Sequence, residues 1–171
     1  MRVGLLTVSD RAASGESEDL SGQALAAVVK AQGWGVAEAA VVPDEAALIS
    51  ERLREWADSG RVDLILTTGG TGFSARDVTP EATLVVVDRL APGLAEAMRG
   101  IGLRKTPHSM LSRAVAGIRG EVLIVNLPGS PKAARENLEV ILPALPHAVE
   151  ILRGEPGAEQ RHVLPPKQPI V

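Results

Sequence analysis

The chain has 171 residues, no cysteine and a formal net charge of −3. Its length suits one domain around one hydrophobic core, and the lack of cysteine excludes disulfides and thiolate metal sites. The weak negative charge, without a basic cluster, argues against nucleic-acid binding, and we see no signal segment or membrane-length apolar run. We therefore expect a cytoplasmic protein that binds neither nucleic acid nor membrane.

The first part of the chain alternates between strand and helix patterns. Short apolar, β-branched runs predict strands, and apolar positions at helical spacing predict helices. Strands are expected at 2–8, 36–42 and 63–67, helices at 23–32 and 43–58, and a mobile loop at 12–18. This alternation is typical of a parallel sheet with right-handed crossovers.

The second part of the chain continues this pattern less regularly. Helices are expected at 80–90, 92–103 and 132–153, a strand at 122–125, and a short helix plus loop at 105–120. Pro143 and Pro146 should bend or break the last helix. We expect residues 1–153 to form one domain and residues 154–171 a polar C-terminal tail.

A glycine-rich loop follows the central strand, with Gly69, Gly70 and Gly72 ahead of Asp77. Glycines let successive N–H groups point at a phosphate, although a loop of this kind can also be only a tight turn. The loop is neither a Walker A nor a dinucleotide fingerprint. A carboxylate beside a phosphate site makes sense if Mg²⁺ lies between them, whereas the bland alternative is that Asp77 only ties down its loop. Thr79 and Pro80 then read as the cap and first residue of a helix.

A second helix start follows the strand at 122–125. Ser130 and Pro131 are a cap and a first helical residue, with Lys132 in the first turn. A cation there opposes the helix dipole, so an anionic ligand would explain it. Lys132 could equally be a solvated side chain.

In a parallel sheet all the strand-to-helix loops lie at one edge, where open α/β sheets bind ligands. Asp44 and Asp77 could then share a cation, although Asp44 is also well placed as a helix cap. Phe73 could flank a base or pterin, or fill a gap under the loop.

The motifs of the chain together resemble the molybdopterin adenylyltransferase family, which includes bacterial molybdenum-cofactor enzymes and a domain of gephyrin. The resemblance covers about residues 2–153. Its motifs are Val8-Ser9-Asp10, Asp19-x-Ser21-Gly22, Val42-Pro43-Asp44-Glu45, Thr68-Gly69-Gly70-Thr71-Gly72, Arg76-Asp77-Val78-Thr79-Pro80-Glu81-Ala82, Leu111-Ser112-Arg113, Gly117-Ile118-Arg119-Gly120 and Asn126-Leu127-Pro128-Gly129-Ser130.

The resemblance implies a three-layer α/β/α sandwich around a mostly parallel sheet, usually trimeric. It implies transfer of AMP from ATP to the terminal phosphate of molybdopterin with release of pyrophosphate, Mg²⁺ as cofactor, and a partner for molybdenum insertion. Asp44 and Asp77 are implied as catalytic and metal-binding residues. The implied nucleotide or phosphate contacts are Gly69, Gly70, Thr71, Gly72, Asn126, Pro128, Gly129 and Ser130, and the implied pterin contacts are Ser9, Asp10, Thr79, Pro80, Ser112 and Arg113.

The chemistry suits a chain without an obvious nucleophile, because a phosphate monoester with a second pKa near 6 is already mostly dianionic at neutral pH. What the protein must supply is positioning and charge neutralisation. The alternative is a non-catalytic molybdopterin-binding or scaffold module on the same fold. Because both aspartates are retained, we favour the enzyme.

Overall fold

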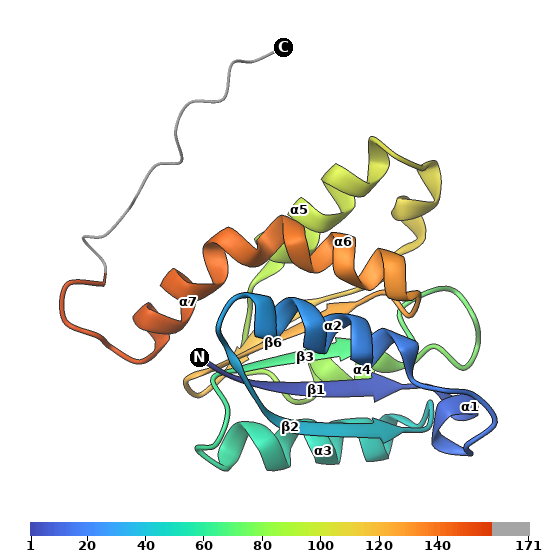
Figure 1. Ribbon diagram of the computed structural model, residues 1–171, viewed down its shortest axis with the longest axis horizontal. Helices are drawn as coiled ribbons and strands as arrows, with labels where there is room; N and C mark the ends of the chain where they lie inside the picture. Colours follow the sequence, from blue (N-terminus) through green and yellow to red (C-terminus); the bar gives the residue numbers. More distant parts are fainter. Residues whose placement is uncertain (159–171) are drawn as a thin grey trace.

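The computed structural model describes residues 1–158 and is built around a six-stranded sheet in the order β2-β1-β3-β6-β5-β4 (Figure 1). β2, β1, β3 and β6 are parallel, β5 runs antiparallel to β6, and β4 runs antiparallel to β5. The strands are Arg2–Val8 (β1), Gly35–Val42 (β2), Leu64–Thr68 (β3), Arg89–Leu90 (β4), Ala116–Arg119 (β5) and Val122–Leu127 (β6).

Helices cover both faces of the sheet. α2, α5 and α6 pack on one face, and α3 and α4 on the other (Figure 1). The predicted three-layer, mostly parallel α/β/α sandwich is thus confirmed. The helices are Asp10–Ala13 (α1), Leu20–Ala31 (α2), Ala46–Asp58 (α3), Thr79–Leu84 (α4), Pro92–Leu103 (α5), Pro131–Ile141 (α6) and Leu145–Leu152 (α7), with 3₁₀ turns at Pro107–Leu111 (η1) and Leu142–Ala144 (η2).

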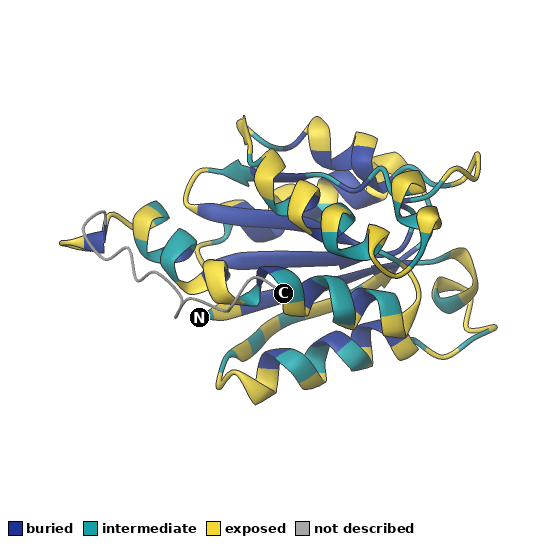
Figure 2. Ribbon diagram, turned by 90° about the horizontal axis from the view of Figure 1, so that it is seen from above, coloured by how far each residue is buried: buried dark blue, intermediate teal, exposed yellow. Residues whose placement is uncertain are grey.

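Each face of the sheet has its own apolar cluster. Leu25, Met98 and Leu138 come from the three helices on one face, while Leu53 and Trp56 of α3 fill the other. Every residue of β3 is buried, as expected for a central strand covered on both sides. In Figure 2 the inner strands are accordingly buried and the outer sides of the helices are exposed.

Three expectations about secondary structure were wrong. The helix expected at 80–90 ends at Leu84, because Val85–Val87 are three β-branched residues with low helix propensity, and Arg89–Leu90 form β4. The segment expected to be helix plus loop contains β5, a four-residue strand defined by its partners. The loop expected at 12–18 is preceded and partly replaced by α1, because the Ser9 hydroxyl accepts a hydrogen bond from Ala12 N–H and starts a helical turn.

The C-terminal helix is interrupted as expected, with η2 separating α6 from α7 near Pro143 and Pro146. Most of the expected tail at 154–171 lies outside the described residues. Within residues 1–158, the helices are too short or too polar to span a bilayer.

Candidate active site

The sheet has a switch point between β1 and β3, because the chain proceeds from β1 to β2 on one side and from β3 to β6 on the other. Crevices for ligands in α/β sheets open at the carboxyl ends of strands at such a point. Ser9 follows β1, Asp44 follows β2, Gly69 follows β3 and Gly129 follows β6, and all four line one cavity. The expected convergence of these loops is confirmed.

The glycine-rich loop has a backbone that only glycine accommodates well. Gly69 and Gly70 have φ angles of 102° and 61°. A Cβ atom at position 69 would lie 2.1 Å from the Val8 carbonyl oxygen, and one at Gly129 would lie 3.2 Å from the Gly69 Cα atom. The loops after β1, β3 and β6 are therefore in direct contact.

Thr79 and Pro80 support this loop from below. Thr79 is fully buried; its hydroxyl donates to the Gly69 carbonyl (2.9 Å) and its N–H donates to the Gly70 carbonyl (3.1 Å). Val78, not Thr79, holds the N-cap position, and Pro80 is buried beside it. The expectation that Thr79 caps the helix by its side chain is wrong, because its hydroxyl bonds to the loop instead. The expected pterin contacts of Thr79 and Pro80 stay predictions.

Asn126 is a second support. Its side chain is fully buried, and its amide donates to the hydroxyls of Thr67 (3.0 Å) and Thr83 (2.9 Å) while its Oδ1 accepts from Val115 N–H (3.3 Å). Its expected contact with the nucleotide stays a prediction. Asn126 joins β6 to β3 and α4 because a buried amide must satisfy its donors and acceptor within the protein.

Arg113 braces the outer side of the loop. Its Nε donates to the Gly72 carbonyl (2.7 Å) and its backbone N–H to the Thr71 carbonyl (2.9 Å). Its guanidinium also reaches the Asp77 carbonyl oxygen and the Glu81 carboxylate. These contacts make Arg113 a brace for the loop that carries Asp77.

Asp44 belongs to a carboxylate pair. Asp44 Oδ2 accepts from Asp10 N–H and Asp10 Oδ1 accepts from Asp44 N–H, both at 3.0 Å. Asp10 is also held by Arg76, through Nη2 (2.7 Å) and Nε (3.0 Å). The alternative that Asp44 caps the following helix is wrong, because α3 begins at Ala46 with Glu45 at the N-cap.

Asp44 and Asp77 lie against neighbouring glycines. A Cβ atom added to Gly70 would lie 3.0 Å from Asp44 Oδ1, and one added to Gly72 would lie 2.9 Å from Asp77 Oδ2. Asp77 Oδ2 also accepts from Ser74 N–H (3.0 Å), which is the loop tie named above as the alternative. Burial raises the pKa of Asp44 against the opposing hydrogen bond from Asp10, and the charges of Asp10 and Asp77 raise it further.

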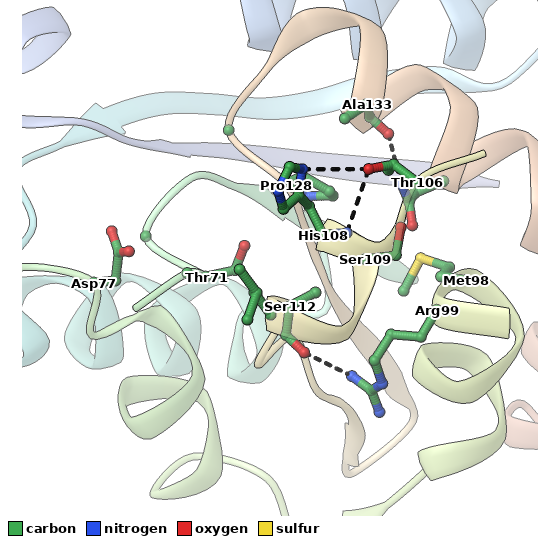
Figure 3. A pocket seen from close by; sticks show the side chains of 15 residues that line it. Thr71, Asp77, Met98, Arg99, Thr106, His108, Ser109, Ser112, Pro128 and Ala133 are labelled. Atoms are coloured by element: carbon green, nitrogen blue, oxygen red, sulfur yellow. Dashed lines mark hydrogen bonds between the residues drawn. The ribbon is translucent and has the colours of Figure 1, made fainter. Parts of the chain in front are cut away.

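Two cavities open on this edge and share Gly70, Asp77 and Gly129 as a common wall. The first, the acidic cavity, has a volume of about 360 Å³; its charged lining residues are Glu18, Asp19, Asp44 and Asp77, with no lysine or arginine among the described residues that line it. The second, the α5 cavity, has a volume of about 440 Å³ and is shown in Figure 3.

The α5 cavity is lined partly by residues that sequence analysis did not single out. Met98 and Arg99 come from α5, and Thr106 and Ser109 precede or belong to η1 (Figure 3). Arg99 donates to the carbonyl oxygens of Ser112 (3.3 Å) and Ala114 (2.9 Å). No local motif marks these residues, because α5 reaches the edge through packing. His108 of η1 also lines this cavity.

The remaining expected residues divide between cavity and surface. Thr71, Ser112 and Pro128 line the α5 cavity, whereas Ser130 caps α6 by accepting from Ala133 N–H (3.1 Å). Lys132 is exposed and lines neither cavity.

Phe73 lies on the outer side of the glycine-rich loop and is 70% exposed. A residue that fills a gap under the loop would be buried, so that interpretation of Phe73 is wrong.

Comparison with known proteins gives one family. The model of a probable molybdopterin binding domain matches residues 4–147. The molybdopterin adenylyltransferase of Helicobacter pylori strain J99 is 44% identical over 156 residues, covering 90% of this chain and 89% of that protein. The enzyme of the same name from Escherichia coli K12 is 40% identical over 174 residues, with 90% and 86% covered. Gephyrin of Dictyostelium discoideum is 46% identical over 164 residues, and the chain spans 23% of its length.

Solved structures agree with these relatives. The molybdopterin biosynthesis enzyme MoaB of Thermus thermophilus superposes with a TM-score of 0.85 at 55% identity, covering 91% of this chain and 98% of that one. A MogA structure gives a TM-score of 0.84 at 42% identity, covering 89% and 99%.

Proposed function

The chain belongs to the family of probable molybdopterin binding domains, and we propose that it is a molybdopterin adenylyltransferase of molybdenum cofactor biosynthesis. It transfers AMP from ATP to the terminal phosphate of molybdopterin and releases pyrophosphate. This is the family and the reaction that the sequence motifs indicate. The proposal goes further than the names of its relatives by placing the reaction at the edge described above.

One observation carries this placement. The acidic cavity and the α5 cavity meet at Gly70, Asp77 and Gly129. A transfer between two substrates requires two compartments whose contents touch at the reacting groups. We place the α-phosphate of ATP and the terminal phosphate of molybdopterin at this common wall.

The residues of the chain act in this reaction by positioning. An oxygen of the molybdopterin phosphate attacks the α-phosphorus of ATP, and the bond from that phosphorus to the bridging oxygen breaks as pyrophosphate leaves. We place the phosphate oxygens against the backbone N–H groups of residues 70–72. The Gly69 N–H is already donated to the Leu127 carbonyl oxygen (3.2 Å). Thr79 and Arg113 donate hydrogen bonds to carbonyl oxygens of that loop, and Asn126 ties the strand that leads into it to α4.

The two aspartates fit a magnesium ion. Asp44 and Asp77 present carboxylate oxygens beside the glycine-rich loop, in a cavity whose described lining residues include no lysine or arginine. Among the described residues no group of three acidic, histidine or cysteine side chains could hold a metal. Mg²⁺ commonly takes one or two protein carboxylates with water and phosphate oxygens, so two suffice. When bound, the ion would neutralise charge on the phosphate oxygens.

Three further expectations stay predictions: a homotrimer, a cytoplasmic location and a partner that inserts molybdenum. They come from family resemblance and from the sequence, and the site described here does not depend on them.

The direct test mixes the protein with ATP, Mg²⁺ and molybdopterin and measures pyrophosphate and adenylylated molybdopterin. We expect both products in equal amounts, and neither when one substrate is omitted. Binding of molybdopterin without any pyrophosphate would favour the non-catalytic scaffold.

A further inference from the structure

Arg76 is next to Asp77 in the chain, but its side chain turns to a different aspartate. Its Nε and Nη2 atoms bind the two carboxylate oxygens of Asp10 at 3.0 and 2.7 Å. A two-point contact of this kind fixes the orientation of a carboxylate as well as its charge. Arg76 thereby links the loop after β3 to the first residue of α1.

Asp10 in turn holds Asp44. Each of the two carboxylates accepts the backbone N–H of the other, so two negative charges are kept close together. Like charges at short range repel, and the guanidinium of Arg76 offsets that repulsion. The Asp44 Oδ2 atom is occupied by this pairing, whereas Oδ1 lies against Gly70 at the wall of the acidic cavity.

We propose that Arg76 is a positioning residue, which acts through Asp10 to hold Asp44 Oδ1 toward the bound metal–nucleotide complex. The proposal rests on the proposed function, since it concerns the same site. It gives Asp10, which the resemblance places against pterin, a role inside the protein. It also explains the use of arginine, because a lysine offers a single point of contact where Asp10 receives two.

The alternative is that Arg76 leaves Asp10 and binds a substrate phosphate directly. A double-mutant cycle separates the two roles. Arg76→Gln removes the cation, and Asp10→Asn removes the charge that needs it while keeping an oxygen that can accept from Asp44 N–H. If Arg76 acts through Asp10, it is dispensable once residue 10 is neutral.

The measurement is calorimetric binding of Mn²⁺ in the presence of ATP, without pterin, to the unaltered protein, the two single variants and the double variant. Changing a residue that orients a metal ligand commonly costs about 10–100-fold in metal affinity. We expect Arg76→Gln to weaken Mn²⁺ binding at least about tenfold, Arg76→Lys to restore part of the loss, and Arg76→Gln to have little effect in the Asp10→Asn background.

Arg61→Gln is the matched control, because Arg61 also pairs with a carboxylate, that of Glu38 in β2, and neither residue lines the two cavities. It should leave Mn²⁺ binding unchanged. Thermal unfolding of each variant shows whether a loss of binding is a loss of fold. If Arg76→Gln alone is unstable, the double variant with Asp10→Asn can be used, because it loses one positive and one negative charge.

Equal losses from Arg76→Gln in both backgrounds would overturn the proposal in favour of direct phosphate contact. No loss from Arg76→Gln would reduce the pair to a surface ion pair, and failure of the unaltered protein to bind Mn²⁺ would overturn it as well. Normal Mn²⁺ binding with the expected cycle but no pyrophosphate would instead refute the proposed function and leave the positioning role standing.

Discussion

The amino ends and the carboxyl ends of the parallel strands form two opposite edges of the sheet, the amino edge and the carboxyl edge. Both edges carry aspartates next to arginines, but the aspartates have different roles. At the amino edge, Asp63 precedes β3 and receives hydrogen bonds from Arg2 Nη2 (2.7 Å), from the Arg2 backbone N–H (2.6 Å) and from Arg153. Burial alone would raise the pKa of Asp63, but these bonds lower it to about 2. At the carboxyl edge, burial beside two other carboxylates raises the pKa of Asp44.

A shifted pKa by itself therefore does not mark a functional site in this protein. Asp63 is 3% exposed and pairs with two arginines, which is the pattern of an anchor that joins the start of β3 to β1 and to the end of α7. Asp44 and Asp77 face a cavity whose lining includes no lysine or arginine among the described residues. Carboxylates that line a phosphate-sized space, with no lysine or arginine among its described lining residues, point to a cation and to function.

The largest expected effect is on stability at the amino edge. Asp63→Ala removes the acceptor shared by Arg2 and Arg153, whose side chains are 50% and 36% exposed and stay solvated. A hydrogen bond to a charged group commonly contributes about 1.5–3 kcal/mol. Urea unfolding should show a loss of this size, with adenylylation per folded molecule unchanged. A loss below about 1 kcal/mol would mean that the Asp63 cluster behaves as an exposed pair.

At the carboxyl edge the expected effect is on rate. Asp77→Ala removes one preorganised electrostatic contact and should lower the rate of pyrophosphate release by about 10²-fold or more. The free energy of unfolding should change by only about 1 kcal/mol, because the lost bond to Ser74 N–H is exposed. Asp88→Ala is the control. It removes an exposed carboxylate that accepts from Gly120 N–H and lines neither cavity, so it should keep full activity.

The pH dependence of stability should follow the anchor. The pKa of Asp63 is about 2 in the folded protein against an ordinary value of 3.8. Its ionised form therefore contributes stability above about pH 4, and this contribution of about 2 kcal/mol is lost as the pH falls toward 2. Unfolding of the unaltered protein and of Asp63→Asn at pH 5 and pH 2.5 should differ by less at the lower pH. A constant difference would contradict this origin.

The smallest expected effect concerns Lys132. It lines neither cavity. The pKa of Glu136 is lowered mainly by its hydrogen bond with Lys105 and to a smaller extent by the charge of Lys132. Lys132→Ala should change the calorimetric affinity for ATP by less than about twofold, as for a screened surface charge. A tenfold loss would restore the expectation that Lys132 contacts an anionic ligand.

The sequence is informative about this fold where structure is local. Apolar runs of strand length located the core strands, and Ser130-Pro131 located the start of α6. It was less informative about β4 and β5, whose short strands are defined by pairing across the sheet. Val85–Val87 were expected to continue the helix, but β-branched residues have low helix propensity and α4 ends before them.

The site shows the same division. The glycine-rich loop and its two aspartates are visible in the chain, because φ angles above zero and close backbone contacts demand glycine. Whether Thr79 and Asn126 face ligand or core is not visible, since both are polar residues in conspicuous motifs and burial alone separates the roles. Arg99 enters the α5 cavity by tertiary packing, which no motif records.

The most direct test of the account uses Asp44→Asn, with pyrophosphate release measured at pH 7 from Mg²⁺, ATP and molybdopterin. Asparagine keeps an oxygen to accept from Asp10 N–H but removes the charge. We expect the rate to fall by about 10²-fold while the free energy of unfolding stays equal or rises, since a half-buried carboxylate beside like charges is lost. Full activity in a folded Asp44→Asn protein would contradict the claim that the carboxyl edge holds a cation for adenylyl transfer.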